Sequence, residues 1–390
     1  MRFIFTTTFY PPYHLGGDAV HVKYLADELA RLGHEVHVLH SIDAYQLKRK
    51  SAPKEEIDNK VHLYPIHTPF NLSAYTAYFS GKSRSTTRKF RAIVEEIEPD
   101  VVHHHNISLL GYDILKKQGQ YSNLYTAHDY WLICQENNLL KNGKEICVSN
   151  SCFSCSLRQL KPPQIWRKRR EFANAIANVD FLISPSNYVK NKIFEKVSIN
   201  GITLSNFVPR PQVEITSSGF SDFFLYAGVL EKHKGILDLL ELFRNTKISS
   251  KLLIAGNGSL RSHIAEYVRK NCLENRIIFL GWVEGSMLTR LLSDATALVM
   301  PSKWEENNPL IALEALSVGT PVIGSNKGGL PEIINKVDTK LVFNQLNELK
   351  GLLQGFSRKG FSSKKIKSVY EENFSPEVYV HKYINAIKKM

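Results

Sequence analysis

Residues 301–315 read PSKWEENNPLIALEA, and this stretch joins two kinds of predicted structure. The aliphatic run at 297–300 predicts a short buried strand, and the apolar positions from Leu310 onward predict a helix. A polar loop with carboxylate and amide side chains lies between them. A strand, a loop and a helix in this order form the repeating unit of a parallel α/β sheet.

The same alternation continues on both sides of this unit. The chain has 390 residues, more than one ordinary core holds, and prolines, a glycine and serines at 207–221 mark a linker. Helices are predicted, among others, at 17–32, 88–97, 109–117, 166–177 and 376–389. Strands are predicted at 2–7, 35–40, 61–66, 101–104, 124–127, 181–184, 223–227, 252–255, 277–280, 297–300, 321–324 and 340–343. The sequence therefore predicts an α/β fold with two Rossmann-like domains, 1–206 and 207–374, each a doubly wound parallel sheet.

The composition is that of a globular protein. Apolar residues make up 43% and charged residues 22%, which excludes a disordered chain, a collagen-like fibre and a small disulfide scaffold. No stretch of about 18 apolar residues predicts a membrane-spanning helix, and the N-terminal residues lack the apolar core of a signal peptide. We therefore expect a cytoplasmic protein whose five cysteines are thiols or metal ligands.

The net charge is +13, from 50 basic and 37 acidic side chains. Such an excess is typical of proteins that bind nucleic acid, anionic membranes or phosphorylated substrates, and it also occurs on surfaces without a partner. The sequence has no recognition-helix, zinc-finger or RNA-binding signature, which argues against nucleic acid. Two basic clusters favour a peripheral position at an anionic membrane face: Lys82, Arg84, Arg88, Lys89 and Arg91, and Arg167, Lys168, Arg169 and Arg170 beside Trp166.

Two carboxylates lie near the start of the helix predicted at Leu310. Glu306 precedes the helix N-terminus, and Glu314 falls about one turn inside it on an otherwise apolar stretch. Two acceptors of hydroxyl hydrogen bonds beside a helix N-terminus suit a nucleotide sugar, whose hydroxyls flank a diphosphate. The alternative is a helix cap and a surface glutamate.

Other loops that follow predicted strands carry groups suited to phosphate. Gly16 and Gly17 open a helix and allow close approach of the backbone to a ligand, unless they form a plain turn. Lys234 follows the first strand of the second domain and is either a diphosphate contact or a solvated lysine. The run GNGSLR at 256–261 has Arg261 where a dinucleotide fingerprint needs glycine, which argues against a nicotinamide enzyme.

Four of the five cysteines lie close together in sequence, with the spacing C-x12-C-x4-C-x2-C. They are Cys134, Cys147, Cys152 and Cys155. The terminal Cys-x-x-Cys is a common half of a tetrahedral zinc site, and Asn142-Gly143 predicts a hairpin tip within the loop. A structural zinc is one interpretation, and reduced thiols or one redox-labile disulfide is the other. Three histidines at 103–105 cannot converge on one metal, because neighbouring strand residues point to opposite faces.

Several motifs together resemble the family 4 glycosyltransferases. The spacing Glu306-x7-Glu314, with GTPV at 319–322 and GGLPE at 328–332, is similar to the donor-site signature of that family. The segments GG at 16–17, PDVVHHHN at 99–106 and TAHDYW at 126–131 are similar to its first glycine loop, its PDvvHxHn strand and its active-site histidine turn. The resemblance implies a GT-B fold, in which two Rossmann-like domains face each other across a cleft and a C-terminal helix, here 375–390, completes the first domain.

The resemblance also implies an activity and the residues that carry it. Family members transfer a sugar from a nucleotide-diphosphate sugar, with a UDP- or GDP-sugar favoured here, to a saccharide or lipid-linked acceptor in cell-surface polysaccharide or glycolipid synthesis. They retain the anomeric configuration and need no catalytic metal or cofactor. The implied catalytic residues are Glu306 on the donor sugar, His128 on the same sugar and Lys234 on the diphosphate. The implied donor site comprises Gly16, Gly17, Lys234, Gly281, Trp282, Val283, Glu306, Asn307, Asn308, Pro309, Leu310 and Glu314, with Glu314 on the ribose and Gly281–Val283 near the base.

One position departs from the family pattern. The family has Gly-Arg-Leu before its lysine, whereas this sequence has Gly228-Val229-Leu230, so the arginine that holds the diphosphate is missing. Lys232, His233 and Arg210 are the candidates to replace it.

The implied mechanism is front-side, with the leaving phosphate taking the acceptor proton, and a double displacement through a carboxylate is the other route. A non-catalytic protein that binds sugar nucleotides is the main rival interpretation.

Overall fold

The computed structural model of the chain describes residues 1–49, 61–142, 145–148, 151–211, 216–283 and 285–390. These residues form two compact units. The first unit comprises Met1–Ser205 and Tyr379–Met390, and the second comprises Asn206–Val378. The sequence predicts the boundary after residue 206 and the return to the first domain at residue 375, whereas the structure has the return at Tyr379.

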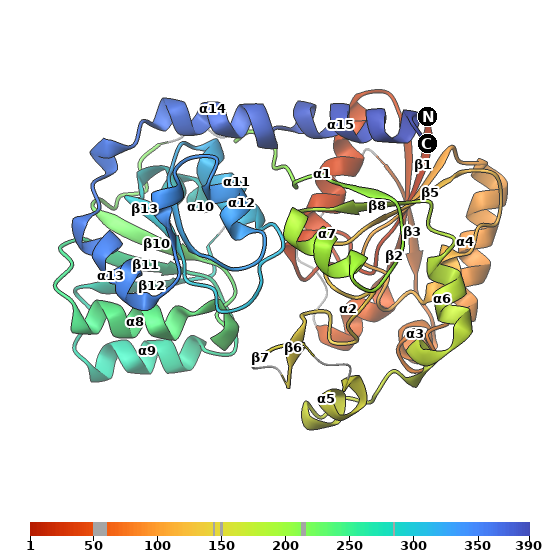
Figure 1. Cartoon of the computed structure of the whole chain (residues 1–390), viewed down its shortest axis with the longest axis horizontal. Helices are drawn as coiled ribbons and strands as arrows, with labels where there is room; N and C mark the ends of the chain where they lie inside the picture. Colours follow the sequence, from red (N-terminus) through yellow and green to blue (C-terminus); the bar gives the residue numbers. More distant parts are fainter. Residues whose placement is uncertain (50–60, 143–144, 149–150, 212–215, 284) are drawn as a thin grey trace. The chain divides into compact units, whose positions relative to one another are not determined.

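The first unit, which contains β1, β2, β3, β5 and β8 as labelled in Figure 1, is built on a seven-stranded parallel sheet. Its strand order is β3-β2-β1-β4-β5-β8-β9. In β1, Phe3, Ile4 and Phe5 are fully buried, as expected for the centre of a parallel sheet that helices cover on both faces. Phe5 pairs with Val38 on one side and with His103 on the other. The strands are β1 (Arg2–Thr6), β2 (Glu35–Ser41), β3 (His62–Ile66), β4 (Val101–His104), β5 (Ser122–Thr126), β8 (Phe181–Ser184) and β9 (Gly201–Thr203).

Eight helices pack in this unit or end in it, among the described residues. They are α1 (Gly17–Arg31), α2 (Ile42–Lys48), α3 (Leu72–Ser80), α4 (Arg84–Ile97), α5 (Cys152–Arg158), α6 (Arg170–Ile176), α7 (Asn187–Phe194) and α15 (Pro376–Lys388). Ser186 caps α7, since its hydroxyl accepts a hydrogen bond from the Val189 N–H at 3.3 Å. Tyr383 of α15 is fully buried, and its ring stacks on that of His103 at 5.4 Å. Within the described residues, no helix combines the length and the apolar character needed to cross a membrane.

The second unit has a six-stranded parallel sheet with the order β12-β11-β10-β13-β14-β15. The strands are β10 (Phe223–Ala227), β11 (Lys251–Ala255), β12 (Ile277–Gly281), β13 (Ala297–Met300), β14 (Val322–Ser325) and β15 (Val342–Phe343). The helices are α8 (Ile236–Asn245), α9 (Arg261–Lys270), α10 (Gly285–Asp294), α11 (Leu310–Ser317), α12 (Leu330–Ile334), α13 (Leu346–Gly355) and α14 (Ser363–Phe374). All strands are parallel and the central ones are fully buried, which confirms the predicted α/β architecture.

Both sheets share a doubly wound strand order. The first strand of each unit lies between the second and the fourth, so that β1 has β2 and β4 as neighbours, and β10 has β11 and β13. The strand order reverses direction at this point. Ligands of such sheets bind outside the carboxyl ends of the strands at the reversal. The loops after β10 and β13, and those after β1 and β4, are therefore the places where a site is expected.

One predicted helix is wrong, and another is interrupted by a single residue. Residues 109–117 form a turn and a 3₁₀ helix, Tyr112–Leu115, because the Tyr112 N–H donates to the Gly81 carbonyl at 2.7 Å instead of continuing a helical ladder. The predicted helix 166–177 is a 3₁₀ helix (Ile165–Lys168) followed by α6, with an extended residue between them. In both places contacts with distant parts of the chain override the local helical pattern.

The hairpin predicted in the cysteine loop is present. Strands β6 (Leu140–Lys141) and β7 (Glu145–Ile146) pair in antiparallel register, with Leu140 opposite Ile146. Asn142 follows β6 as predicted, and Gly143 of the predicted tip lies outside the described residues.

Candidate functional site

The second unit brings two of the predicted catalytic residues together at its switch point. Lys234 ends a 3₁₀ helix (Lys232–Lys234) in the loop after β10, and Glu306 lies in the loop after β13. The Lys234 Nζ lies 2.7 Å from Glu306 Oε1 and 3.0 Å from Oε2, so the two side chains form an ion pair. Strands β10 and β13 are neighbours in the sheet, which explains why residues 72 positions apart meet.

Glu306 is held as a buried carboxylate. Its residue is 3% exposed, and it also accepts a hydrogen bond from the Ser302 hydroxyl. Burial raises the pKa of Glu306, but the Lys234 ammonium and the hydrogen bonds from Lys234 and Ser302 outweigh burial, so the pKa lies below its ordinary value. The Lys234 Nζ also lies 5.0 Å from the centroid of the Trp304 ring. The carboxylate is therefore ionised and fixed in direction.

Two glycines let the backbone pack closely enough to form this arrangement. A Cβ on Gly235, which has φ +74°, would lie 1.8 Å from the Pro301 carbonyl oxygen. A Cβ on Gly328, with φ +61°, would lie 2.2 Å from the Glu306 carbonyl oxygen. That same oxygen accepts a hydrogen bond from the Gly329 N–H at 2.6 Å. The GGLPE motif at 328–332 thus supports the loop that carries Glu306.

Glu314 has a different environment from Glu306. It lies in the middle of α11, where burial raises its pKa to about 7. Its carboxylate has no hydrogen-bond or ion-pair partner within the described part of the chain. The side chain is half-buried, and a bound hydroxyl group can supply a hydrogen-bond partner for its carboxylate.

The remaining predicted donor-site residues of this unit lie in two places. Asn308 is buried, with its Oδ1 accepting from the Asn206 N–H at 3.1 Å, so the loop before α11 is anchored. Asn307 lies beside it, Pro309 is the residue that precedes α11, and α11 begins at Leu310. Gly281 is the last residue of the edge strand β12, and Trp282 and Val283 follow it, with the Trp282 side chain 79% exposed.

Three residues are candidates for the role of the arginine that Val229 replaces, and the structure gives them different environments. Arg210 is committed elsewhere, because it donates to Glu371 at 2.6 Å and 3.0 Å and to Glu377 at 2.7 Å. Burial and the Lys234 charge lower the pKa of His233, so this ring is neutral near pH 7. Lys232 is exposed at the start of the same 3₁₀ helix and keeps a positive charge near Lys234. Of the three candidates, Lys232 is therefore the cation that remains available.

In the first unit, the half-buried His128 contacts a row of buried rings. It follows β5, and its Nε2 lies 2.9 Å from Nδ1 of His105, which follows β4. His105 packs on His103 at 4.0 Å, and His103 shares hydrogen bonds with Tyr383 and Thr126. Burial lowers the pKa of His128 to about 3 and lowers those of His103 and His105 well below the ordinary value. His128 is therefore a neutral hydrogen-bonding group, and not an acid catalyst, near pH 7.

The histidine run shows the predicted alternation. His104 points away from its two neighbours, and its Nδ1 lies 2.7 Å from the Thr6 hydroxyl. The contact between His105 and His128 was not predicted, because it depends on which strands are neighbours. Gly16 and Gly17 lie exposed at the start of α1, and the adjacent Asp18 accepts a hydrogen bond from Asn106 at 3.0 Å. The glycine loop and the end of β4 thus lie close together in this unit.

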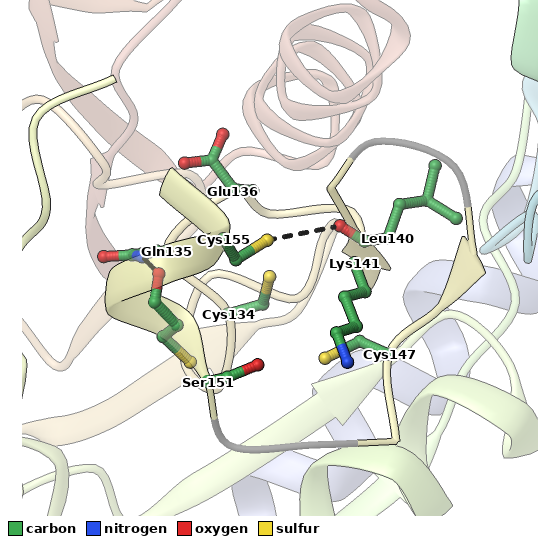
Figure 2. A pocket seen from close by; sticks show the side chains of 9 residues that line it. Cys134, Gln135, Glu136, Leu140, Lys141, Cys147, Ser151 and Cys155 are labelled. Atoms are coloured by element: carbon green, nitrogen blue, oxygen red, sulfur yellow. Dashed lines mark hydrogen bonds between the residues drawn. The ribbon is translucent and has the colours of Figure 1, made fainter. Parts of the chain in front are cut away.

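The four cysteines of the loop after His128 line one small pocket, with Gln135, Glu136, Leu140, Lys141 and Ser151 (Figure 2). No three of their sulfurs lie mutually within 4.8 Å. Within the described residues, the group of potential metal ligands that does meet this distance is Glu35, His37 and His62 on β2 and β3. Sequence inspection missed this group because His37 and His62 meet only through the register of the two strands.

Comparison with known proteins agrees with this geometry. Residues 15–204 match the family described as Glycosyltransferase Family 4, and residues 214–351 match Glycosyl transferases group 1. An uncharacterized glycosyltransferase of Methanocaldococcus jannaschii is 29% identical over 352 residues, which cover 86% of this chain and 83% of the relative. A glycogen synthase of Mycobacterium tuberculosis is 27% identical over 373 residues, which cover 86% and 80%.

A solved structure shows the same fold. The Anabaena protein HepE, crystallised in complex with UDP, superposes with a TM-score of 0.68 at 12% identity, and the match covers 100% of both chains. The sequence families cover both sheets, and the structural match spans both units. The chain therefore belongs to glycosyltransferase family 4, and its two parallel-sheet units have the GT-B fold.

Proposed function

We propose that this glycosyltransferase moves a sugar from a nucleotide-diphosphate sugar to a saccharide or lipid-linked acceptor, with retention of configuration and without a catalytic metal. The observation that carries the proposal is the donor-type constellation at the switch point of the second unit. A buried carboxylate, Glu306, is held by Lys234, and a second, half-buried acid, Glu314, has no partner in the described chain. The two carboxylates can accept hydrogen bonds from the hydroxyls of the sugar and of the ribose, and the Lys234 ammonium can bind the diphosphate between them.

The Lys234–Glu306 ion pair explains how the donor is held. An ammonium group has three hydrogen-bond donors, and Glu306 engages Lys234 through both oxygens in the structure. We assign the diphosphate to Lys234, with Lys232 as a second positive charge, and the hydroxyls of the transferred sugar to Glu306. The first N–H groups of α11 have no intrahelical partner and add to the attraction for phosphate. Glu314 receives the ribose hydroxyls.

The proposed chemistry is a front-side displacement. The bond from carbon 1 to the diphosphate oxygen breaks, and the departing phosphate oxygen takes the proton of the attacking acceptor hydroxyl. Stabilisation of the developing charge on the diphosphate by Lys234 then provides most of the catalysis. We assign to His128 a hydrogen bond to the donor sugar, which its neutral state permits, because a neutral imidazole can both donate and accept.

For the donor we favour a UDP-sugar. The support is the UDP bound in the HepE structure, which shares the fold, and the exposed Trp282 ring at the end of β12, where a base can stack. Thermal-shift measurements with UDP, GDP, ADP and the matching sugar nucleotides test this choice, because a ligand that binds the folded state raises its melting temperature. UDP and one UDP-sugar should give the largest shifts.

A transfer assay separates the proposal from the rival interpretation. The purified enzyme should release UDP from the selected UDP-sugar, and Glu306→Gln should slow this release. Glu241→Gln on the exposed face of α8 is the matched control and should behave like wild type. Binding of the sugar nucleotide without any release of UDP would favour a non-catalytic binding protein.

A peripheral membrane position is supported by an exposed surface of the first unit. The helix α3 and the segment around α5 expose large apolar side chains, and the Tyr78 hydroxyl of α3 donates to the Pro162 carbonyl at 3.0 Å, which joins the two parts. Arg167 of the predicted basic cluster is largely buried, whereas Arg84, Arg88, Lys168, Arg169 and Arg170 are exposed. The exposed apolar side chains of this α3–α5 surface are Phe70, Leu72, Tyr75, Phe79, Phe153, Leu157, Leu160 and Ile165.

Apolar side chains flanked by basic ones suit the interface of an anionic membrane, where each basic group contributes about 1 kcal/mol. We therefore propose that the α3–α5 surface docks on the cytoplasmic face of a membrane and gives access to a lipid-linked acceptor. Vesicles with anionic lipid should sediment wild type, and Leu72→Ser with Phe79→Ser should weaken this binding. Leu346→Ser, an exposed leucine of the second unit, is the control. Equal binding of wild type and the double variant would contradict the assignment.

A further inference from the structure

The cysteine loop contains a potential metal site that the proposed transfer reaction does not use. Cys134 follows the turn that carries His128, Cys147 follows β7, and Cys152 and Cys155 lie one turn apart on α5. Three separate parts of the loop thus place a cysteine at the same pocket, and Figure 2 shows the sulfurs of Cys134, Cys147 and Cys155 around it. Two cysteines on one turn of a helix and two on preceding loops are a common ligand set of structural zinc sites.

Hydrogen-bond donors already point at the sulfurs. The Asn142 N–H donates to Cys155 Sγ at 3.2 Å, and the Gln159 side-chain amide donates to the same sulfur at 3.3 Å. Burial raises the pKa of the Cys134 thiol, and the backbone N–H groups of Leu139, Glu136 and Asn138 partly oppose this effect. Donors of this kind stabilise thiolates and are the usual second layer around ligating cysteines. An ordinary pair of buried thiols does not require so many donors.

The second, independent observation is a buried cation without a carboxylate partner. The Arg167 guanidinium lies 4.9 Å from the Trp131 ring, 4.9 Å from the Trp166 ring and 5.3 Å from the Phe172 ring. It donates to the Trp131 carbonyl and to Gln164, whereas its Nη2 has no hydrogen-bond partner among the residues that the structure describes. No carboxylate of the described chain forms an ion pair with Arg167. Burial lowers the pKa of Arg167, and the groups whose charge would oppose this are Cys134, Tyr125, Asp129 and Cys152, so two of the four are cysteines of the loop.

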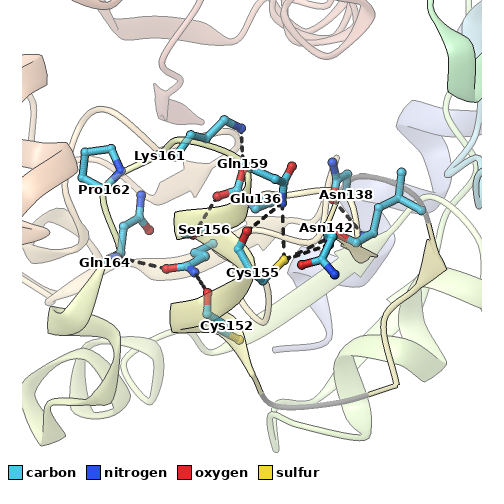
Figure 3. A network of polar contacts seen from close by, with 12 residues as sticks. Glu136, Asn138, Asn142, Cys152, Cys155, Ser156, Gln159, Lys161, Pro162 and Gln164 are labelled. Atoms are coloured by element: carbon cyan, nitrogen blue, oxygen red, sulfur yellow. Dashed lines mark hydrogen bonds and ion pairs between the residues drawn. The ribbon is translucent and has the colours of Figure 1, made fainter.

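The loop itself has little structure to hold it together. Its hairpin has two residues in each strand, and α5 has seven residues without a side-chain cap at its N-terminus. One end of α5 is fixed by the buried Glu136, which accepts hydrogen bonds from Ser156 and Lys161 (Figure 3). The other end, with Cys152, is exposed and lies at the pocket. A loop with so small an apolar core gains stability from a metal cross-link.

We propose that Cys134, Cys147, Cys152 and Cys155 bind one structural Zn²⁺ ion in tetrahedral coordination. Binding displaces four thiol protons, including the one that Cys155 directs at the Leu140 carbonyl, and involves no oxidation or reduction. The resulting centre carries four thiolate charges and one Zn²⁺, a net charge of −2, which supplies the counter-charge for Arg167. No three of the four sulfurs lie mutually within 4.8 Å, so coordination at the Zn–S distance of about 2.3 Å requires the cysteine side chains to move closer together.

The site has a structural connection to the histidine turn. Arg167 donates to the Trp131 carbonyl at 2.6 Å, and the Trp131 N–H donates to the Asp129 carboxylate at 2.8 Å. Asp129 is the neighbour of His128 in the chain. The metal site is therefore connected through Arg167 and Trp131 to the residue next to His128, without contacting any substrate. This inference stands independently of the donor and of the reaction proposed above.

Metal analysis of the full-length protein tests the site. Purified wild type should contain about one zinc per chain, and Cys152→Ser with Cys155→Ser should contain less than a tenth of that amount. Cys272→Ser, which removes an exposed cysteine of the second unit, is the matched control and should keep the zinc. Replacement by Co²⁺ should give the intense visible bands of a tetrahedral thiolate site.

A second measurement covers the case in which the double variant does not fold. Stepwise modification of wild type with a mercurial reagent should release one zinc as four thiols react, while Cys272 reacts without release. The proposal is overturned if wild type contains no metal and all five thiols titrate at once. A disulfide between Cys152 and Cys155 in freshly purified protein, or iron with acid-labile sulfide, would also overturn it.

Discussion

The substitution Glu306→Gln separates the two roles assigned to the Lys234–Glu306 pair. It keeps the shape of the side chain and its ability to accept one hydrogen bond, but it removes the charge that holds Lys234 at 2.7 Å. The hydroxyls of the transferred sugar then face a neutral amide. A hydrogen bond to a charged group contributes roughly 1.5–3 kcal/mol, and the sugar is the part of the donor that changes in the transition state. We therefore expect kcat to fall about 10- to 150-fold.

The same variant should not weaken the binding of UDP. In wild type, Lys234 is shared between Glu306 and the diphosphate, and its side chain is 23% exposed. Without the carboxylate, Lys234 is free to turn fully toward the phosphates, so the Kd for UDP should stay constant or decrease. Loss of the buried partner destabilises the protein, by roughly 1–3 kcal/mol after allowance for the partial exposure of Lys234.

Steady-state kinetics with the selected UDP-sugar and calorimetric titration with UDP measure both effects. Glu241→Gln, an exposed glutamate on α8, controls for the loss of one negative charge. A kcat equal to that of wild type would refute the contact between Glu306 and the transferred sugar. Weaker UDP binding in parallel with kcat would instead place Glu306 on the nucleotide.

Three further predictions follow from the geometry. Glu314→Gln should mainly raise the donor KM. It should also change stability, because burial raises the pKa of Glu314 from 4.5 to about 7, and ionisation of this wild-type side chain as the pH rises through that range destabilises the fold. Chemical denaturation should thus show the variant to be more stable than wild type by roughly 1–3 kcal/mol at pH 8, and the two proteins should be equally stable at pH 4. Equal stability of the two proteins at both pH values would contradict this prediction. Gly328→Ala should lower the melting temperature and kcat, because its Cβ would collide with the Glu306 carbonyl, while Gly351→Ala, with open space around it, should lower neither. His105→Phe removes the 2.9 Å contact that orients His128, so it should lower kcat about tenfold without changing the affinity for UDP. His105→Asn should restore part of the lost kcat, and an unchanged kcat in His105→Phe would show that His128 needs no such partner.

The sheet strands could be predicted because buried parallel strands are apolar on both faces. The runs around Phe3 and Leu253 therefore mark the centres of their sheets in the sequence itself. The positions of Glu306 and Lys234 could also be predicted, since both follow strands of the doubly wound order. Their direct ion pair could not, because it depends on β10 and β13 being neighbours.

The errors have the same origin. Tyr112 leaves the predicted helix because its N–H donates to Gly81, and no local pattern reports that contact. His105 and His128 meet because β4 and β5 are adjacent, and His37 meets His62 through the register of β2 and β3. Arg167 was predicted on a basic surface because its neighbours in sequence are basic, but aromatic rings cover it. Each case requires knowledge of which distant segments pack together.

The central claim is that the second unit binds a nucleoside diphosphate through Lys234 and Glu314. Calorimetric titration of UDP into wild type, Glu314→Gln and the control Glu241→Gln tests it most directly. Glu314 is the better probe, since it has no partner in the described chain whose loss would disturb the fold. We predict one UDP per chain in wild type and in the control, with a Kd about tenfold or more higher for Glu314→Gln. Equal affinity in all three proteins, or no binding of UDP, GDP or ADP to wild type, would contradict the account.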